Sequence, residues 1–323
     1  MGFLGEQLNA YLRDAHAIAQ RALPQLRAAP DAAGDLALGT AFRQHLVETE
    51  HHKELIGDRL EARGVSPLRL NNAAFRSNGF PFVLFRGSQP DPPGNLIAHA
   101  LFHEHLEIAT QELLRRMAEL AGDHTTVAVA RAIREDERAM AERLEASIDR
   151  AVEASLREVD RANIEAIVDR HLADAHAIEA EATQLLERGP RLAGNAALGQ
   201  LYEEHRYDCR DHQRRVRERL DARGAPADSV KEAALRLGAL DWGALFVAQV
   251  DTPAKLAAVA YAFEFLEVGC YEQLKRVARR AGDGGTERLA EHILADEREM
   301  AERLWGGFDA ALDAWLVPQE VLA

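Results

Sequence analysis

The chain has 323 residues, enough for two domains of roughly 150 residues that could each bury a core. Alanine, leucine, glutamate and arginine are abundant while aromatic residues make up only 6% of the chain, so we predict an all-α protein. The formal net charge of −14 opposes non-specific binding to nucleic acid, and we interpret Arg214, Arg215 and Arg217 as parts of solvated helix faces.

Cysteine usage and hydropathy exclude further classes of protein. Cys209 and Cys270 have no CxxC spacing, so the sequence predicts neither a disulfide framework nor a zinc–thiolate site. No charged-then-apolar leader opens the chain, and no run approaches the roughly 18 apolar residues of a membrane span. We therefore expect a soluble cytoplasmic protein that binds neither nucleic acid nor membrane.

Helical periodicity and matching breakers divide the chain into two sets of four predicted helices. The predicted helices cover residues 4–28, 36–63, 95–121 and 124–156 in the first half and residues 162–188, 195–223, 253–281 and 285–316 in the second. Gly64 and Gly224 are expected to end helices, and Gly122 and Gly282 to form tight turns. Pro24 is expected to kink the first helix.

The two sets of helices repeat one another at a constant offset in the sequence. DAHAI begins at Asp14 and again at Asp174, which is 160 positions later, and DER-x-MAERL begins at Asp136 and at Asp296 with the same offset. The pattern indicates a tandem duplication, with predicted domains at residues 1–157 and 158–323. The two copies can therefore be compared with each other, and polar residues that are present in both are candidates for a shared role.

In each half about 30 residues separate the second predicted helix from the third, which is too long for a tight turn. A four-helix bundle with one long crossover between helices 2 and 3 is ferritin-like, so we predict two tandem ferritin-like four-helix bundles. The crossovers differ most between the halves, and their notable features are Phe75, Phe80, Phe82 and Phe85 in the first and a helical segment near Val230 to Leu240, followed by Trp242, in the second. A core plug and a lid are equally open interpretations of these aromatic residues.

Ionisable side chains interrupt the apolar stripes of the predicted helices in both halves. In the first half the residues on or beside the stripes are His16, His45, Glu48, His52, His103, Glu104, Glu107 and Glu137. In the second half they are His176, Glu179, His205, Asp208, His212, Glu264, Glu267 and Glu297. Other histidines, such as His105 and His171, fall off the stripes or have no counterpart, and we interpret them as surface or packing residues.

Inward-facing ionisable groups drawn from four helices need compensation, because an unpaired buried ion costs several kcal/mol and a whole domain retains only about 5–15 kcal/mol. Carboxylates and imidazoles together suit iron, manganese or zinc, and a pair of metal ions can share bridging glutamates. The alternative is an internal ion-pair network, for which Arg59 and Arg219 at the edge of the stripes would be the partners.

Several segments resemble the bacterial YciF-type ferritin-like family, which is associated with stress. The first half carries LRDAHAIAQRALPQL from Leu12, the His-Leu-x-Glu-Thr run from His45, EHLEIA from Glu104 and EDER from Glu135. The second half is similar more weakly, through LADAHAIEAEATQLL and EFLEVGCYEQL. The resemblance implies a bundle like those of di-iron proteins, with acidic ligands on all four helices and a histidine on the second.

Matching this pattern position by position implies one set of metal ligands in each half. The implied ligands of the second half are Glu179, Asp208, His212, Glu264, Glu267 and Glu297, and those of the first are Glu48, His52, Glu104, Glu107 and Glu137. In the first half Ala19 replaces the first-helix glutamate, a departure for which His16, one turn away, could substitute. His45, His176 and His205 complete the candidate donors. Met140 and Met300 stand where ferritins place a further histidine.

The resemblance and the inward polar set together predict a metal-binding protein that acts in oxidative or general stress. We expect iron or manganese as cofactor, one or two ions per bundle and more readily in the second half, with reduction of peroxide or oxygen as an activity that such a site could support. The rival hypothesis is a metal-free helical stress or scaffold protein with a relic polar interior. A hemerythrin-like carrier is disfavoured because its ligands are richer in histidine. The expected assembly is a homo-oligomer or a monomer that acts as a pseudo-dimer.

Overall fold

The computed structural model describes residues 2–66, 92–157, 159–160, 163–225 and 252–320, and these residues form helices and short connections without a strand. The all-α prediction is therefore confirmed. The helices of the first half are α1 (Phe3–Ala32), α2 (Leu36–Ala62), α5 (Pro92–Leu120), α6 (His124–Glu145) and α7 (Ile148–Leu156). Those of the second half are α8 (Ile164–Glu187), α9 (Gly189–Leu192), α10 (Ala196–Arg223), α13 (Thr252–Ala281), α14 (Gly284–Gly306) and α15 (Phe308–Glu320).

The bounds of these helices differ from the predicted ones mainly at the fourth helix of each half. Residues 124–156 and 285–316 were expected to be single helices, but each is broken, between α6 and α7 near Ser147 and between α14 and α15 at Gly307. The helix α1 continues through Pro24. The aromatic residues predicted to plug or cover the bundles, Phe75, Phe80, Phe82, Phe85 and Trp242, and the segment Val230 to Leu240 lie outside the described residues.

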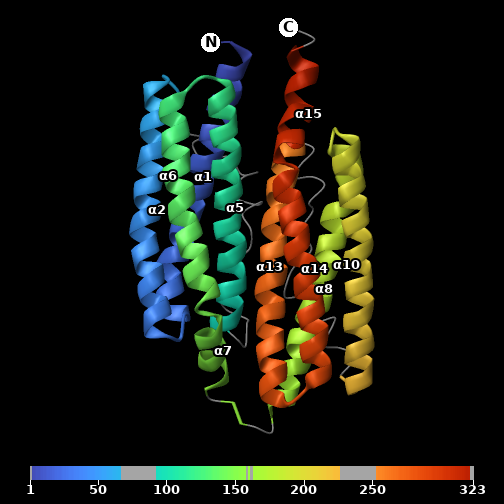
Figure 1. The fold of residues 1–323 in the computed structure, drawn as a ribbon. Helices are drawn as coiled ribbons and strands as arrows, with labels where there is room; N and C mark the ends of the chain where they lie inside the picture. Colours follow the sequence, from blue (N-terminus) through green and yellow to red (C-terminus); the bar gives the residue numbers. More distant parts are fainter. Residues whose placement is uncertain (1, 67–91, 158, 161–162, 226–251, 321–323) are drawn as a thin grey trace.

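Within each half the four long helices pack side by side (Figure 1). In the first half α1 packs against α2 and α5, and α6 packs against α5 and α2. The second half repeats this arrangement, because α8 packs against α10 and α13, and α14 packs against α13 and α10. The ionisable residues on the inner faces of the four helices are therefore aimed at one another.

The two halves meet along a seam between α5 and α13, which lie next to each other in the middle of the molecule (Figure 1). His105 stacks on Phe265, and these two residues occupy equivalent positions 160 apart in the repeat. Two ion pairs are related in the same way, since Arg276 pairs with Asp149 at 2.8 Å and Arg116 pairs with Asp309 at 2.5 Å. Such reciprocal contacts are the mark of an isologous, two-fold interface.

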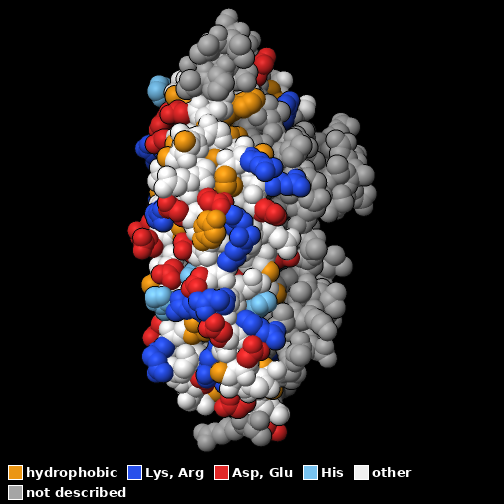
Figure 2. All heavy atoms as spheres, turned by 90° about the vertical axis from the view of Figure 1, so that its right-hand side faces the viewer, with side chains coloured by type: hydrophobic (Ala, Val, Ile, Leu, Met, Phe, Trp, Pro, Cys, Tyr) orange, Lys and Arg blue, Asp and Glu red, His pale blue; other side chains and the backbone are white. Residues whose placement is uncertain are grey.

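The surface carries charges of both signs. Figure 2 shows acidic and basic side chains interspersed over the face of the second half. On α10, Arg214 pairs with Asp211 and with Glu218, each at 2.5 Å, and Arg217 pairs with Asp221 at 3.1 Å. These arginines therefore lie on a charge-balanced helix face, as expected. None of the described helices is long and apolar enough to span a bilayer.

Candidate metal centre

The second half buries a group of carboxylates and imidazoles contributed by all four of its long helices. Helix α8 supplies Glu179, α10 supplies His205 and His212, α13 supplies Glu264 and Glu267, and α14 supplies Glu297; each is at most 3% exposed. Donor atoms of His205, Glu264, Glu267 and Glu297 lie within 4.8 Å of one another, and so do donor atoms of Glu179, His212 and Glu297. The two groups share Glu297.

Short contacts within the group connect the imidazoles to carboxylates. His205 Nε2 lies 2.8 Å from Glu264 Oε1, and His212 Nδ1 lies 2.9 Å from Glu297 Oε1 and 3.6 Å from Glu179 Oε1. Among the described residues, no lysine or arginine forms an ion pair with Glu179, Glu264, Glu267 or Glu297. The ion pairs found within the group are therefore all with histidines.

Several carboxylate oxygens in this group have no hydrogen-bond partner. Both oxygens of Glu267 and both oxygens of Glu297 are buried and unpartnered, and so are one oxygen of Glu179 and one of Glu264. The Glu297 contact with His212 is short, but its geometry is not that of a hydrogen bond. Native proteins leave few buried polar atoms unsatisfied, because each costs about 1–3 kcal/mol or more if charged. A cation among these oxygens would satisfy them.

The first half contains a smaller version of the same arrangement. His45 Nε2 lies 3.0 Å from Glu104 and 3.3 Å from Glu137, and these three residues form the donor group of this half. His52 Nδ1 contacts Glu137 at 2.9 Å, and Glu107 is buried beside the group. Position 19 contributes only a buried alanine methyl group, so this half lacks the carboxylate that α8 provides in the other.

Polar residues outside the two groups orient their members. In the first half Asp136 contacts His52 Nε2 at 3.0 Å, and in the second half Asp296 contacts His212 Nε2 at 3.2 Å. The Tyr271 hydroxyl donates a hydrogen bond of 2.6 Å to Glu179. A carboxylate on the far nitrogen of an imidazole fixes the ring orientation, an arrangement common for metal-binding histidines.

Without a cation, protons balance the buried charges. Burial raises the pKa of Glu179 and of Glu104 to about 7 and that of Glu264 to about 8. Burial would lower the pKa of His212, but its contacts with Glu179 and Glu297 outweigh that effect and raise the pKa to about 11. The group therefore retains protons at neutral pH that a cation could replace.

Some predicted ligands lie away from these groups. His16 and His176 are half-buried, and Asp208 is exposed; none of the three belongs to a donor group. Glu48 is also half-buried and touches His45 at 3.2 Å, at the edge of the first group. The alternative partners are engaged elsewhere: Arg59 pairs with Asp123 at 3.0 Å, and Arg219 pairs with Asp283. The alternative prediction, that Arg59 and Arg219 pair with the inward-facing ionisable groups, is therefore wrong.

One donor was missed by the sequence argument. Cys209 is fully buried on α10, and its sulfur lies within 4.8 Å of carboxylate oxygens of Glu179 and Glu267. The absence of a CxxC pair led to the expectation that the chain has no zinc–thiolate site. The helical spacing could have identified this donor. Cys209 is four residues after His205 and three before His212, so it lies on the same face of α10 as these histidines.

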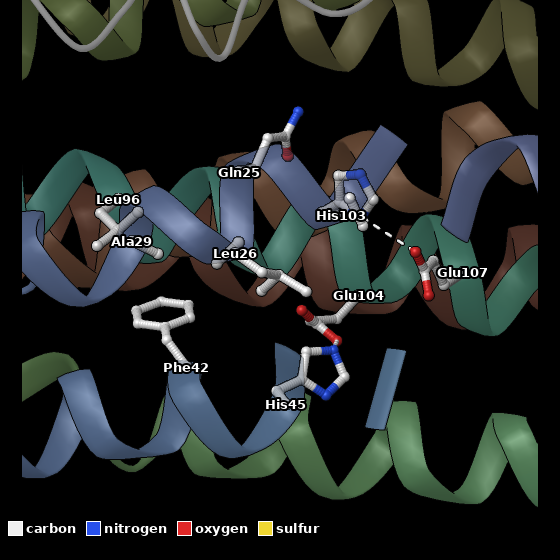
Figure 3. Close-up of a pocket in the computed structure, with 11 residues that line it drawn as sticks. Gln25, Leu26, Ala29, Phe42, His45, Leu96, His103, Glu104 and Glu107 are labelled. Carbon is white, nitrogen blue, oxygen red and sulfur yellow. Dashed lines mark ion pairs between the residues drawn. The ribbon is translucent and has the colours of Figure 1, made fainter. Parts of the chain in front are cut away.

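A pocket leads to the first group from between α1, α2 and α5 (Figure 3). Its volume of about 20 Å³ admits a water-sized molecule. Leu96, Ala29 and Phe42 line one end, and the other end is polar, with His103 in contact with Glu107 at 3.5 Å. Phe263 is the counterpart of His103 in the second half and is 3% exposed.

Comparison with known proteins gives one match to a family. The model of the family described as a domain of unknown function, DUF892, matches residues 94–157 and 164–313. The matched residues include α6, α7 and most of α5 in the first half and most of the second half. No solved structure matches the chain. Because the family model covers well over half of the 323 residues, this chain belongs to the DUF892 family.

Proposed function

We propose that the chain is a metal-binding protein built from two ferritin-like four-helix bundles, residues 1–157 and 158–323, and that the second bundle holds a pair of divalent ions. The observation that carries this proposal is the burial of Glu267 and Glu297 with none of their four oxygens in a hydrogen bond and only one of them, in Glu297, in an ion pair with a histidine. A carboxylate in that state costs several kcal/mol unless a cation is close to it.

Charge balance supports two ions in the second half. Glu179, Glu264, Glu267 and Glu297 carry four negative charges when ionised, which two divalent ions offset while His205 and His212 remain neutral ligands. Glu297 belongs to both donor groups and is therefore the residue that would bridge the ions. Shared glutamates of this kind are a feature of two-metal sites in four-helix bundles.

The first half is expected to bind fewer ions. Glu104, Glu107 and Glu137 supply three buried carboxylates, one fewer than in the second half. His45 and His52 would be its nitrogen ligands, and Glu48 lies at its edge. We assign one ion to this half, next to the pocket that contains His103.

The donor set is rich in carboxylate oxygen with one or two imidazoles, which suits iron or manganese. Bound in this position, such an ion would supply the electrons for reduction of peroxide or dioxygen, in keeping with a role in stress. The chain's own contribution is to orient the imidazoles through Asp136 and Asp296 and to surround the ions with buried side chains. The reciprocal seam contacts support a monomer that acts as a pseudo-dimer.

The test is elemental analysis of the full chain after growth with iron and manganese and purification without chelator. We expect the parent to carry metal and Glu297→Gln, which keeps the size of the side chain but removes its charge, to lose both ions of the second half. Glu291→Gln is the matched control, because Glu291 lies on the exposed face of α14. A parent without metal, whose circular dichroism shows a folded helical protein, would favour the metal-free scaffold.

A further inference from the structure

Cys209 lies where the apolar core of the second half meets its buried group of ionisable residues. Its side chain is fully buried, and its sulfur is 3.7 Å from Nε2 and 3.8 Å from Nδ1 of His205. The sulfur, one oxygen of Glu179 and one oxygen of Glu267 lie within 4.8 Å of one another. Three residues that could each donate an atom to a cation therefore converge from α8, α10 and α13.

Unpartnered oxygens point to a ligand at this position. Both oxygens of Glu267 and one oxygen of Glu179 have no hydrogen-bond partner, although both residues are fully buried. A thiol is only a weak donor and cannot satisfy three carboxylate oxygens.

The first half has no such donor. The counterpart of Cys209 is Thr49, whose hydroxyl donates a hydrogen bond of 2.9 Å to the backbone oxygen of His45. The first half thus accommodates a side chain of similar size, Thr49, and the hydroxyl of this residue bonds to the backbone of its own helix. Packing at this position therefore does not itself require a sulfur atom.

We propose that Cys209 is a sulfur ligand of the second half's metal centre and that it makes this half prefer thiophilic divalent ions such as Zn²⁺ and Co²⁺ to Mn²⁺. The inference rests on the proposed metal-binding function and adds a ligand to it. Binding forms a bond between Sγ and the ion and releases the thiol proton to solvent, without change of oxidation state. Thiolate ligands select zinc-like ions, whereas an oxygen and nitrogen set such as that of the first half suits manganese.

The experiment adds Co²⁺ to the metal-free full chain and records the near-ultraviolet absorption, where a thiolate bound to Co²⁺ gives an intense charge-transfer band that carboxylates and imidazoles do not give. We expect the band in the parent and in Cys270→Ser, which alters the other cysteine. It should be lost in Cys209→Ser and in Cys209→Thr, which copies the first half. Adding Thr49→Cys to the Cys209→Thr chain should restore a band from the first half.

Competition between Zn²⁺ and Mn²⁺ provides the second readout. Cys209→Thr should lower the preference of the second half for Zn²⁺ by at least about tenfold, a loss typical even of residues that only support a ligand. Co²⁺ bound to the parent without the band, or a band that survives Cys209→Thr, overturns the sulfur ligand and leaves the metal-binding function standing. Failure of the parent to bind any Co²⁺, Zn²⁺ or Mn²⁺ overturns both.

Discussion

Position 19 and its counterpart 179 show most clearly how one residue changes the chemistry of a half. Glu179 is fully buried, accepts a hydrogen bond of 2.6 Å from Tyr271 and approaches His212. In the first half Ala19 takes its place, and the counterpart of Tyr271 is Gln111, whose side-chain oxygen is buried without a partner. The carboxylate and the group that orients it are therefore both absent from the first half.

Exchanging these residues between the halves should change the number of metal ions that each half binds. We expect Glu179→Ala to bind about one ion fewer per chain, because a buried ligand and its negative charge are both removed. Ala19→Glu should keep or gain metal, and adding Gln111→Tyr should increase the gain, since the hydroxyl then orients the new carboxylate. Elemental analysis of metal per chain measures this. Equal metal content in the parent and all three variants would contradict the assignment of ligands.

At the scale of single residues, helical periodicity predicted the core of the site. Glu267 and Glu297 stand on apolar stripes, and a stripe that must be buried carries its polar members inward. Asp208 was predicted as a ligand both from its place on or beside the apolar stripe and from the family pattern, but it is exposed. Cys209 occupies the buried face. Periodicity alone therefore did not separate the buried positions of α10 from the edge of its inward face.

At the scale of elements, the turn before the fourth helix is held by the same contacts in both halves. Asp123 caps α6 through the backbone N–H of Thr126 and accepts hydrogen bonds from Arg59 and Arg63. Asp283 does the same for α14 through Thr286, Arg219 and Arg223. One carboxylate thus ties the second helix of each bundle to the start of the fourth and fixes the height at which the ligands of those helices meet.

Replacement of Asp283 should reveal this contribution through its dependence on pH. Burial would raise the pKa of Asp283, but Thr286, Arg219 and Arg223 outweigh it and lower the pKa from 3.8 to about 2. Because the pKa is lower in the folded state, the stabilisation is complete above about pH 4 and is lost as the pH falls towards 2. Asp283→Asn should retain the cap but lose the ion pairs, at a cost of about 1–2 kcal/mol at neutral pH.

Urea unfolding of the metal-free protein at pH 6 and at pH 2.5 checks this prediction. The difference between the parent and Asp283→Asn should be clear at pH 6 and small at pH 2.5. Asp313→Asn, on the exposed face of α15, is the control and should leave the unfolding midpoint unchanged at both values. A difference that does not depend on pH would mean that the cap geometry, and not the charge, matters.

The helices themselves were largely predictable, because glycines mark their ends. Gly64 and Gly224 adopt φ of 69° and 67°, the left-handed conformation expected after the last turn of a helix. The breaks in the fourth helices were not predictable. Ser147 and Gly307 are tolerated inside helices, and only the packing of α7 and α15 against α13 shows why the chain changes course there.

At the scale of the whole molecule, the two halves depend on close contact between α5 and α13. Gly269 on α13 faces α5 so closely that an added Cβ would lie 2.7 Å from the Cα of Ala98. The backbone of Ala98 cannot move aside as the end of a flexible side chain can, so only glycine fits at position 269 without a shift of the helices. The duplication therefore yields a single body whose buried apolar residues, such as Phe102 and Phe263, pack across the seam at a centroid distance of 6.5 Å.

Gly269→Ala should therefore destabilise the protein by about 1–3 kcal/mol, the usual cost of overpacking. Gly57→Ala is the matched control, because Gly57 is also in a long helix but has open space where its Cβ would lie. That substitution should stabilise the helix by about 0.5–1 kcal/mol. Urea unfolding of the two variants measures both effects, and similar midpoints for both would show that the seam is not close-packed.

The central claim, that buried carboxylates of both halves hold metal ions, is tested most directly by anomalous diffraction at the iron, manganese and zinc absorption edges. Crystals would be grown from protein produced with all three metals and purified without chelator. We predict two peaks in the second half, both within about 2.0–2.6 Å of Glu297 oxygens, and one peak beside His45 in the first half. Well-ordered clusters with no anomalous peak at any of the three edges would contradict the account.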